Sequence, residues 1–427
     1  MIIYFTKELR VSFDLSPNLT FFILKLKKVH IGIIKERKIP RDNRAPFTPG
    51  QINYLMKTYP ELAVSIEPDD ERCFRDEDYK KAGAIISNDL RKCDVIFGVK
   101  EIPSDYLFNN KQYFFFSHTI KGQSYNMPML RNILKRGIHL IDYELLTNNS
   151  GKRLVAFGRY AGLVGAYNAL WTYGKKSGVY MLPRAFESGS ILAMFEIVKE
   201  IKLPALKFLV TGTGRVASGA AEILEQAGVQ KVSRKSYLSD NKMNAPVYLQ
   251  LGMKDYHKSK NGDEFNYQDF YADPSSFSST FHQYIPHTDV LITGAYWDPK
   301  APVLFTREDM LKQDFNIGII ADITCDIRGS VPSTIRASSI ENPVYDYDPS
   351  NDQEKPAFTG QYSVMAIDNL PNEIPADAST GFGEALSKKV FPELFKKESE
   401  LIRRASIAKG GELMPAFSYL GKYLENQ

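Results

Sequence analysis

The sequence predicts an α/β protein in which two lobes, each with a parallel sheet, face each other across a cleft. Apolar segments of strand length alternate with helix-length segments along most of the chain. A glycine turn lies between a strand and a helix in the second half. The length of 427 residues fits two domains of moderate size better than one or four.

The first lobe is expected to begin with a buried strand at 29–36, followed by a helix at 47–60 with Thr48 at its N-cap and Pro49 at its first position. Further strands are predicted at 94–100, 112–118 and 138–144. Lys100, His118 and Glu144 then stand at or just beyond strand ends. In open α/β sheets the carboxyl ends of the strands form the edge where ligands bind.

The second lobe is expected to interrupt the first. Residues 29–190 and 360–427 are assigned to a discontinuous substrate lobe, and 191–359 to a Rossmann-like nucleotide lobe inserted in it. Residues 1–28 do not match the α/β pattern and are interpreted as an N-terminal extension. The polar stretch around 240–285 predicts an insertion with hairpin or helical pieces.

The glycine turn follows the apolar segment ALKFLVT. Gly212, Gly214 and Ala217 fit the spacing G-x-G-x-x-G/A, with Arg215 and Val216 between them. Such a turn lets a pyrophosphate approach the start of a helix, because glycine has no side chain to obstruct it. A turn that merely connects strand and helix is the alternative. The order strand, turn, helix favours the dinucleotide interpretation.

The choice of dinucleotide is predicted from the segment that follows. NAD-binding folds place an Asp or Glu about 20 residues beyond the first glycine, where it binds the ribose hydroxyls. Here Arg234 and Lys235 occupy that region, and the first acid is Asp240. These positive charges favour binding of a 2′-phosphate. The sequence therefore predicts a preference for NADP over NAD, with Arg234 as the partner of the 2′-phosphate. Solvated surface charges are the alternative interpretation.

Composition excludes several classes of protein. Hydrophobic residues make up 43% and charged residues 24%, as in soluble globular proteins. The net charge of +4 and the absence of a basic block predict neither nucleic-acid nor membrane binding. The apolar segment 19–26 is too short to cross a membrane. Three scattered cysteines predict no disulfide framework, no metal site and a reducing, cytoplasmic location.

Eight segments of the sequence together resemble one known family: ERKIPRDNRAPFTP, GVKEIP, FFSHTIKGQSYNMPML, LIDYELL, GKRLVAFGRYAG, GTGRVASGA, ADITCDIRGS and MAIDNLPNEIPADAS. They resemble the lysine-forming saccharopine dehydrogenases, in particular the lysine-ketoglutarate reductase half of the aminoadipic semialdehyde synthases. Those enzymes lie within the alanine dehydrogenase and transhydrogenase fold group. The resemblance covers roughly residues 29–395 in order.

The resemblance implies an NAD(P)-dependent oxidoreductase acting on CH–NH groups. It implies that lysine and 2-oxoglutarate condense to an imine whose reduction gives saccharopine, or the reverse. Lys100 and His118 match the family's proton-transfer pair. Burial can bring the pKa of a lysine towards neutrality, and histidine already titrates there, so both side chains suit that task. Taken singly, Lys100 would be interpreted as a solvated lysine and His118 as a hydrogen-bonded strand end. Their joint placement favours the catalytic interpretation.

The resemblance also implies substrate contacts. Arg44 and Arg153 match basic positions that bind carboxylates, and Glu144 matches an acid that meets an ammonium group. Phe157 is expected to form a wall of the pocket, and Asp368 to lie at the cofactor edge. Two alternatives remain open: an alanine dehydrogenase-like enzyme acting on pyruvate and ammonia, and a non-catalytic nucleotide-binding protein like the transhydrogenase component. The sequence does not determine the oligomeric state.

Overall fold

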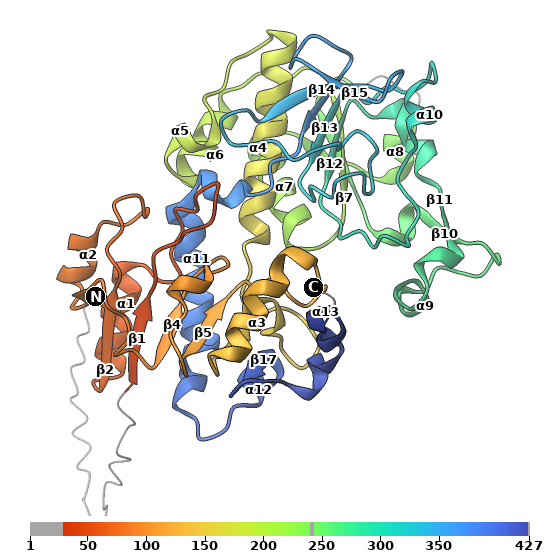
Figure 1. Cartoon of the computed structure of the whole chain (residues 1–427). Helices are drawn as coiled ribbons and strands as arrows, with labels where there is room; N and C mark the ends of the chain where they lie inside the picture. The colour runs from red at the N-terminus through yellow and green to blue at the C-terminus, as the bar shows by residue number, and fades with distance from the viewer. Residues whose placement is uncertain (1–28, 240–242, 426–427) are drawn as a thin grey trace, which may run out of the picture.

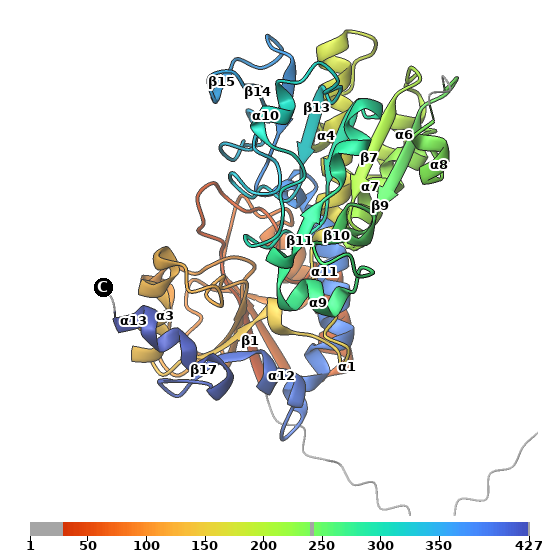
Figure 2. The ribbon, with the colours of Figure 1, turned by 90° about the vertical axis from the view of Figure 1, so that its right-hand side faces the viewer.

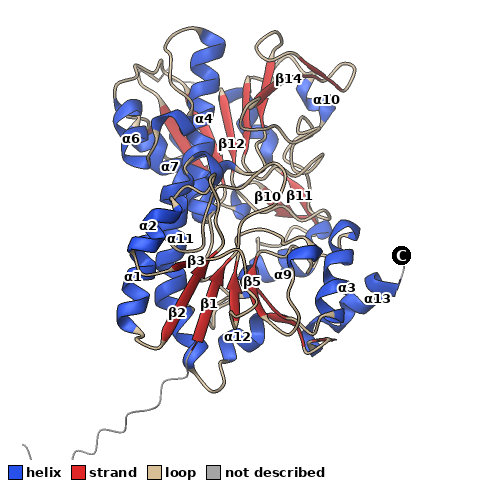
Figure 3. Cartoon of the chain, turned by 60° about the vertical axis from the view of Figure 1, so that its left-hand side comes forward, coloured by secondary structure: helices blue, strands red, loops and turns tan. Residues whose placement is uncertain are grey.

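The computed structural model describes residues 29–239 and 243–425, which form two α/β lobes joined by a long helix (Figure 1). The expected N-terminal extension, 1–28, lies outside the described residues. Two sheets lie one above the other with helices on their flanks (Figure 3). The predicted α/β class with two largely parallel sheets is confirmed.

The first lobe contains an eight-stranded sheet in the order β18-β17-β6-β5-β4-β1-β2-β3. Strands β1 to β6 all run parallel to one another. Strands β17 and β18 form one edge of the sheet, where β17 pairs antiparallel with β6 and β18 pairs antiparallel with β17. Their bounds are β1 Val29–Ile33, β2 Leu62–Ile66, β3 Ile85–Ile86, β4 Val95–Phe97, β5 Gln112–Phe115, β6 His139–Asp142, β17 Ser406–Lys409 and β18 Glu412–Leu413. The helices of this lobe are α1 Pro49–Thr58, α2 Asp76–Lys81, α3 Met127–Lys135, α11 Pro375–Lys389, α12 Glu400–Ala405 and α13 Gly421–Glu425.

The second lobe contains a sheet in the order β15-β14-β16-β13-β12-β7-β9-β8, with antiparallel strands β14 and β15 at one edge. Its strands are β7 Lys207–Thr211, β8 Gln230–Lys231, β9 Val247–Leu251, β12 Val290–Thr293, β13 Ile319–Asp322, β14 Val344–Asp348, β15 Gln353–Lys355 and β16 Tyr362–Met365. Its helices are α4 Gly158–Ser177, α5 Ala185–Ser188, α6 Ile191–Lys199, α7 Arg215–Gln226, α8 Arg234–Tyr237, α9 Tyr267–Ala272 and α10 Arg307–Met310. A separate hairpin pairs β10 His257–Ser259 with β11 Phe277–Ser279.

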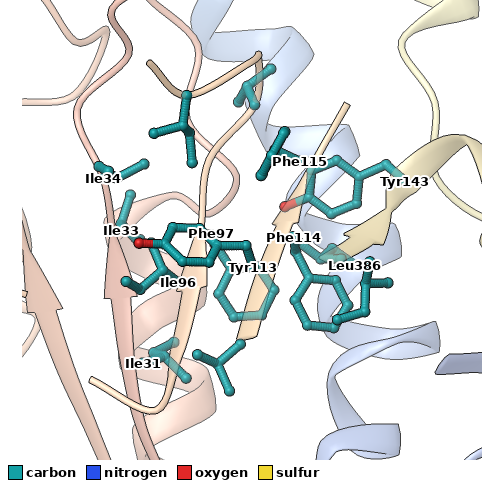
Figure 4. Packing of buried hydrophobic residues seen from close by; sticks show 14 of the residues in the cluster. Ile31, Ile33, Ile34, Ile96, Phe97, Tyr113, Phe114, Phe115, Tyr143 and Leu386 are labelled. Carbon is teal, nitrogen blue, oxygen red and sulfur yellow. The ribbon is translucent and has the colours of Figure 1, made fainter. Parts of the chain in front are cut away.

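The aromatic run that precedes His118 forms part of the first core. Tyr113, Phe114 and Phe115 of β5 are fully buried. Phe114 stacks on Phe97 of the neighbouring β4, with ring centroids 4.8 Å apart (Figure 4). Burying aromatic rings on both faces of the sheet stabilises the strand ends that carry Lys100 and His118.

Close packing between α4 and α7 holds these two helices together within the second lobe. A Cβ atom on Gly162 would lie 1.9 Å from the carbonyl oxygen of Val216, and one on Gly219 would lie 2.1 Å from that of Arg159. Only glycine permits this approach of the two backbones. Arg159 and Glu222 add a side-chain ion pair between the same helices.

The lobe boundaries differ from the expected ones. Helix α4 packs in the core of the second lobe, because Leu163, Tyr167 and Leu170 are buried against its sheet. Strand β16 pairs with β13 and β14 of the second sheet, although residues from 360 onward were assigned to the first lobe. The chain therefore enters the second lobe near α4 and leaves it after β16, before α11 returns to the first core. Among the described residues, no helix is long and apolar enough to cross a membrane.

Candidate active site

Lys100 lies just beyond β4, where a buried carboxylate fixes its backbone. Glu36, which follows β1, accepts hydrogen bonds from the amides of Val99 at 2.6 Å and Lys100 at 2.9 Å. Burial lowers the pKa of Lys100, and the positive charges of Arg44 and Lys38 lower it further, against Asp42 and Asp368. A lysine with a lowered pKa is suited to accept a proton near neutral pH.

His118 follows β5, the strand next to β4, and its backbone adopts the left-handed conformation with φ of 51°. Its Nδ1 lies 2.5 Å from Oε1 of Glu101, and its carbonyl accepts a hydrogen bond from Asn126 at 2.9 Å. This backbone conformation is uncommon outside glycine, and it ends the strand so that the ring stacks beside Phe116. The side chain keeps 29% of its surface exposed, which leaves it accessible to a substrate.

Glu101 lies between His118 and Lys38 and forms an ion pair with each. Burial acts to raise the pKa of Glu101, but the hydrogen bond and charge of His118 and the charge of Lys38 lower it to about 2. Lys38 Nζ lies 3.4 Å from Glu101 Oε2. The carboxylate at Nδ1 orients the imidazole, which leaves Nε2 as the other ring nitrogen available for proton transfer.

Arg44 is buried and its guanidinium is paired within the protein. Nε and Nη2 contact the two carboxylate oxygens of Asp42 at 2.9 and 2.5 Å, and Nη2 also donates to Asn369 at 2.8 Å. The guanidinium lies 4.1 Å from the ring centroid of Phe157. Burial acts to raise the pKa of Asp42, but Arg44 outweighs it and the pKa falls to about 2. Arg44 thus stands at the expected edge with an ionised partner.

Glu144 and Arg153 are brought together as an ion pair at 3.3 Å. Glu144 is held at the end of β6 because its amide donates to Asp142 at 2.7 Å. The carbonyl of Arg153 accepts a hydrogen bond from Arg215 at the start of α7. This contact joins the substrate edge of the first lobe to the glycine turn of the second.

Phe157 belongs to an aromatic cluster at this edge. Its ring stacks on Phe382 of α11, with centroids 4.4 Å apart and planes 9° apart. Phe116 packs against the same two rings at 6.0 Å. Apolar rings beside Arg44 exclude water from its guanidinium and strengthen its electrostatic interactions.

The glycine turn leaves the start of α7 uncovered by side chains. Gly212 has φ of 101°, and a Cβ atom there would lie 3.0 Å from the backbone of Gly294 and Ala295 after β12. Gly214 caps α7 without a side-chain hydrogen bond, and a Cβ atom on it would meet nothing within 4 Å. The first amides of α7 are therefore open to an anion. Ala217 is fully buried, which lets the helix lie close to the sheet.

The prediction for Arg234 is wrong in its placement. Strand β9, not β8, lies next to β7, so the segment beside the glycine turn is the one that follows Leu251. Arg234 begins α8, where it donates to Gln283 at 2.7 Å and lies over the ring of Tyr284. Gly252 takes the place near Thr213, because a Cβ atom on it would lie 3.5 Å from the Thr213 methyl group.

Comparisons with known proteins agree with the two-lobed fold. The family model described as "Alanine dehydrogenase/PNT, N-terminal domain" matches residues 32–164. An alpha-aminoadipic semialdehyde synthase of Arabidopsis thaliana is 31% identical over 93% of the chain, and the lysine-forming, NAD(+) saccharopine dehydrogenase of Neurospora crassa is 26% identical over 83%. The chain is similar in sequence to the lysine-forming saccharopine dehydrogenases. The predicted resemblance is thus confirmed, and the relatives are dehydrogenases.

Coverage differs between these relatives. The alignment spans 42% of the Arabidopsis synthase but 87% of the Neurospora saccharopine dehydrogenase. A solved L-alanine dehydrogenase superimposes with a TM-score of 0.61 at 14% identity, covering 93% of this chain and 100% of its own. A transhydrogenase from Sinorhizobium meliloti gives 0.58 at 16% identity, covering 91% of this chain and 100% of its own. These two structures support the two-lobed α/β fold of the chain.

Three acids at this edge were not predicted from the sequence; Glu36 and Asp42 are buried and Glu101 is half-buried. Glu36, Asp42 and Glu101 lie within the quoted segments ERKIPRDNR and GVKEIP, but nothing local indicates that they face Lys100, Arg44 and His118. Asp368, expected at this edge, is exposed and lies near enough to Lys100 for its charge to raise the lysine's pKa. Among the described residues, no group of three or more His, Cys, Asp or Glu has the arrangement of a metal site.

Proposed function

We propose that this protein condenses L-lysine with 2-oxoglutarate and reduces the resulting imine with NAD(P)H to give saccharopine, or runs the reverse reaction. The arrangement that supports this best is the pair of basic groups on neighbouring strands, Lys100 after β4 and His118 after β5, with Glu101 from the β4 side against the imidazole. Imine formation requires one group to accept a proton and another to supply one. A lysine with a lowered pKa and a carboxylate-oriented histidine meet both requirements.

Lys100 takes a proton from the ε-ammonium of lysine, so that the free amine attacks the ketone carbon of 2-oxoglutarate. His118 donates a proton to the hydroxyl group that leaves as water when the C=N bond forms. Bound NAD(P)H supplies the hydride that reduces this bond. Glu101 stabilises the imidazolium before the proton is given up, since its carboxylate lies 2.5 Å from Nδ1.

Charged side chains at the same edge are proposed to bind the substrates. Arg44 and Arg153 offer guanidinium groups to carboxylates, and Glu144 offers a carboxylate to the α-ammonium of lysine. Arg44 is already paired with Asp42, and Arg153 is already paired with Glu144. Substrate charges would therefore join or exchange partners within existing ion pairs, which spares the protein an isolated buried charge.

The nucleotide is proposed to bind with its pyrophosphate at the start of α7, against Gly212, Gly214, Arg215 and Val216. NADP is favoured over NAD because Gly252 occupies the position beside the glycine turn where NAD-binding folds carry an acid. Lys254, exposed two residues further on, replaces Arg234 as the proposed partner of the 2′-phosphate. Asp255 is engaged by the Gly252 amide at 2.7 Å.

The cofactor proposal is tested by titrating the protein with NADPH and NADH and following nucleotide fluorescence. We expect tighter binding of NADPH, and a loss of that preference in Lys254→Ala. Arg234→Ala serves as a matched control that removes a cation at the other strand and leaves the preference intact. Equal or tighter binding of NADH by the parent protein would contradict the NADP assignment.

The catalytic proposal is tested by incubating the protein with lysine, 2-oxoglutarate and NADPH and identifying the product by mass. Oxidation that requires both substrates and yields the mass of saccharopine is the expected result. The alanine dehydrogenase-like alternative would oxidise cofactor with pyruvate and ammonia instead. The non-catalytic alternative would bind nucleotide without oxidising it under either condition.

A further inference from the structure

The loop that directly follows His118 packs against a segment from far along the chain. This segment, 415–425, contains the 3-10 turn Pro415–Leu420 and helix α13. Helix α13 lies beside α3 of the first lobe in two perpendicular views (Figures 1 and 2). Two tyrosines of the segment, one from each element, contact the loop 119–122.

The 415–425 segment is itself anchored in the first lobe. Phe417 and Leu420 are buried in the hydrophobic core of this lobe. Arg131 of α3 donates a hydrogen bond from Nε to the carbonyl oxygen of Leu424 at 3.2 Å. Because both elements of the segment are held, its tyrosines have fixed positions relative to the sheet that carries His118.

Tyr419 and Tyr423 contact the loop at two points. The hydroxyl group of Tyr419 donates a hydrogen bond to the carbonyl oxygen of Ile120 at 2.7 Å. Gly122 has φ of 64°, and a Cβ atom on it would lie 2.6 Å from Cε2 of the Tyr423 ring. The ring can approach the backbone this closely only because residue 122 has no side chain. The two tyrosines therefore hold both the middle and the end of the loop.

Two functional groups depend on the position of this loop. His118 precedes it directly, and its φ of 51° is a backbone conformation that persists only when the surroundings hold it. Nζ of Lys121 lies 5.8 Å from the ring centroid of Tyr296, which follows β12 in the second lobe. The charge of Lys121 also acts on the carboxylate of Asp326, after β13, against the burial that raises its pKa. A displaced loop would move the imidazole and this contact between the lobes together.

We propose that Tyr419 and Tyr423 are positioning residues, which clamp the loop 119–122 and thereby fix the His118 imidazole and the contact of Lys121 with the second lobe. Both tyrosines act through the backbone of the loop. The inference rests on the proposed catalytic role of His118. Misplacing a reacting group by about 1 Å can lower a rate on the order of 100-fold, so loss of the clamp should be visible in kcat.

Gly122→Ala tests the clamp, because the new methyl group would displace the Tyr423 ring. Gly137→Ala is the matched control, since φ is 62° there and a Cβ atom would lie 2.6 Å from Oδ1 of Asn110, before β6 at the opposite edge of the same sheet. Gly122→Ala should lower kcat on the order of 10-fold or more with little change in nucleotide affinity, whereas Gly137→Ala should keep the parent's kcat. Equal kcat values in the two variants would overturn the clamp.

Two substitutions of Tyr423 separate its ring from its hydroxyl group, and they apply even if Gly122→Ala does not fold. Tyr423→Leu removes the ring beside Gly122, so kcat should fall roughly 5-fold or more and the amides of residues 119–122 should exchange hydrogen faster. Tyr423→Phe keeps the ring and should retain the parent's values of both quantities. A folded Tyr423→Leu with parent-like kcat and exchange, or equal effects of the two substitutions, would contradict the positioning role.

Hydrogen exchange measured by mass spectrometry keeps this inference distinct from the proposed function. Tyr419→Phe removes the donor to Ile120 and should also speed exchange in the loop, whereas Tyr180→Phe, which removes a 2.8 Å bond to the Leu170 carbonyl in the second lobe, should not. A parent protein that oxidises no cofactor with lysine and 2-oxoglutarate would overturn the proposed function and the catalytic role of the clamp. An active parent with unchanged loop exchange and kcat in both Tyr419→Phe and Tyr423→Leu would overturn the clamp alone.

Discussion

Replacing Gly162 by alanine should destabilise the second lobe, because a single methyl group would separate α4 from α7. The new Cβ atom would lie 1.9 Å from the Val216 carbonyl oxygen and 2.8 Å from the Ala220 amide, whereas ordinary contact begins near 3.4 Å. The helices would have to move apart by about 1.5 Å at this crossing. Overpacking of this kind costs roughly 1–3 kcal/mol or more.

Better helix propensity offsets part of this cost, since alanine is favoured over glycine by about 1 kcal/mol within a helix. The crossing requires backbone atoms to move, so we expect the overpacking cost at or above the upper end of its range. A net loss of about 2 kcal/mol corresponds to a fall in Tm of roughly 4–8 °C for a domain of this size. Because Val216 lies in the first turn of α7, beside the glycine turn, nucleotide affinity should fall as well.

Thermal unfolding followed by circular dichroism measures this effect. Gly50→Ala provides the matched control, since it makes the same substitution in α1, where a Cβ atom meets only Thr48 Oγ1 at 3.8 Å. The control should leave Tm unchanged or slightly raised. A Gly162→Ala variant that melts within about 1 °C of the parent would refute the close crossing of the two helices.

Three further predictions concern the catalytic edge. Lys100→Met and His118→Ala should each lower kcat by a factor on the order of 100 or more with nearly intact cofactor binding, and activity within a few-fold of the parent in both would remove them from catalysis. Lys38→Met removes a positive charge that lowers the pKa of Lys100, so that pKa should rise. Because Lys100 must be neutral to accept a proton, the acidic limb of the kcat/KM profile should move to higher pH, and a shift to lower pH would oppose this role. Glu144→Gln should raise the KM for lysine more than that for 2-oxoglutarate, and the opposite order would reassign this acid.

Local signals in the sequence predicted much of the fold. Thr48 caps α1 in a capping box with Gln51, as the residue order around Pro49 indicates. The apolar runs that end before Lys100 and His118 form neighbouring parallel strands. These features depend on short-range periodicity and on helix-start chemistry, which the sequence displays directly.

Long-range pairing was harder to predict. Strand β9 lies beside β7 although the two-residue strand β8 precedes it in the chain, so the expected position of Arg234 was displaced by a whole strand. The partners Asp42 and Glu101 depend on how separate loops meet at the sheet edge, which no local pattern encodes. Helix α4 likewise joined the second lobe through its glycine contacts with α7 rather than through its own periodicity.

The rate of cofactor oxidation with two substrate pairs tests the central proposal most directly. The protein is supplied with its preferred reduced dinucleotide and with either lysine plus 2-oxoglutarate or pyruvate plus ammonia. Arg44, Arg153 and Glu144 should favour the dicarboxylic oxo acid and the long amine, so the cofactor should be oxidised much faster with the first pair. Faster oxidation with pyruvate and ammonia, or no oxidation with either pair, would contradict the proposed saccharopine chemistry.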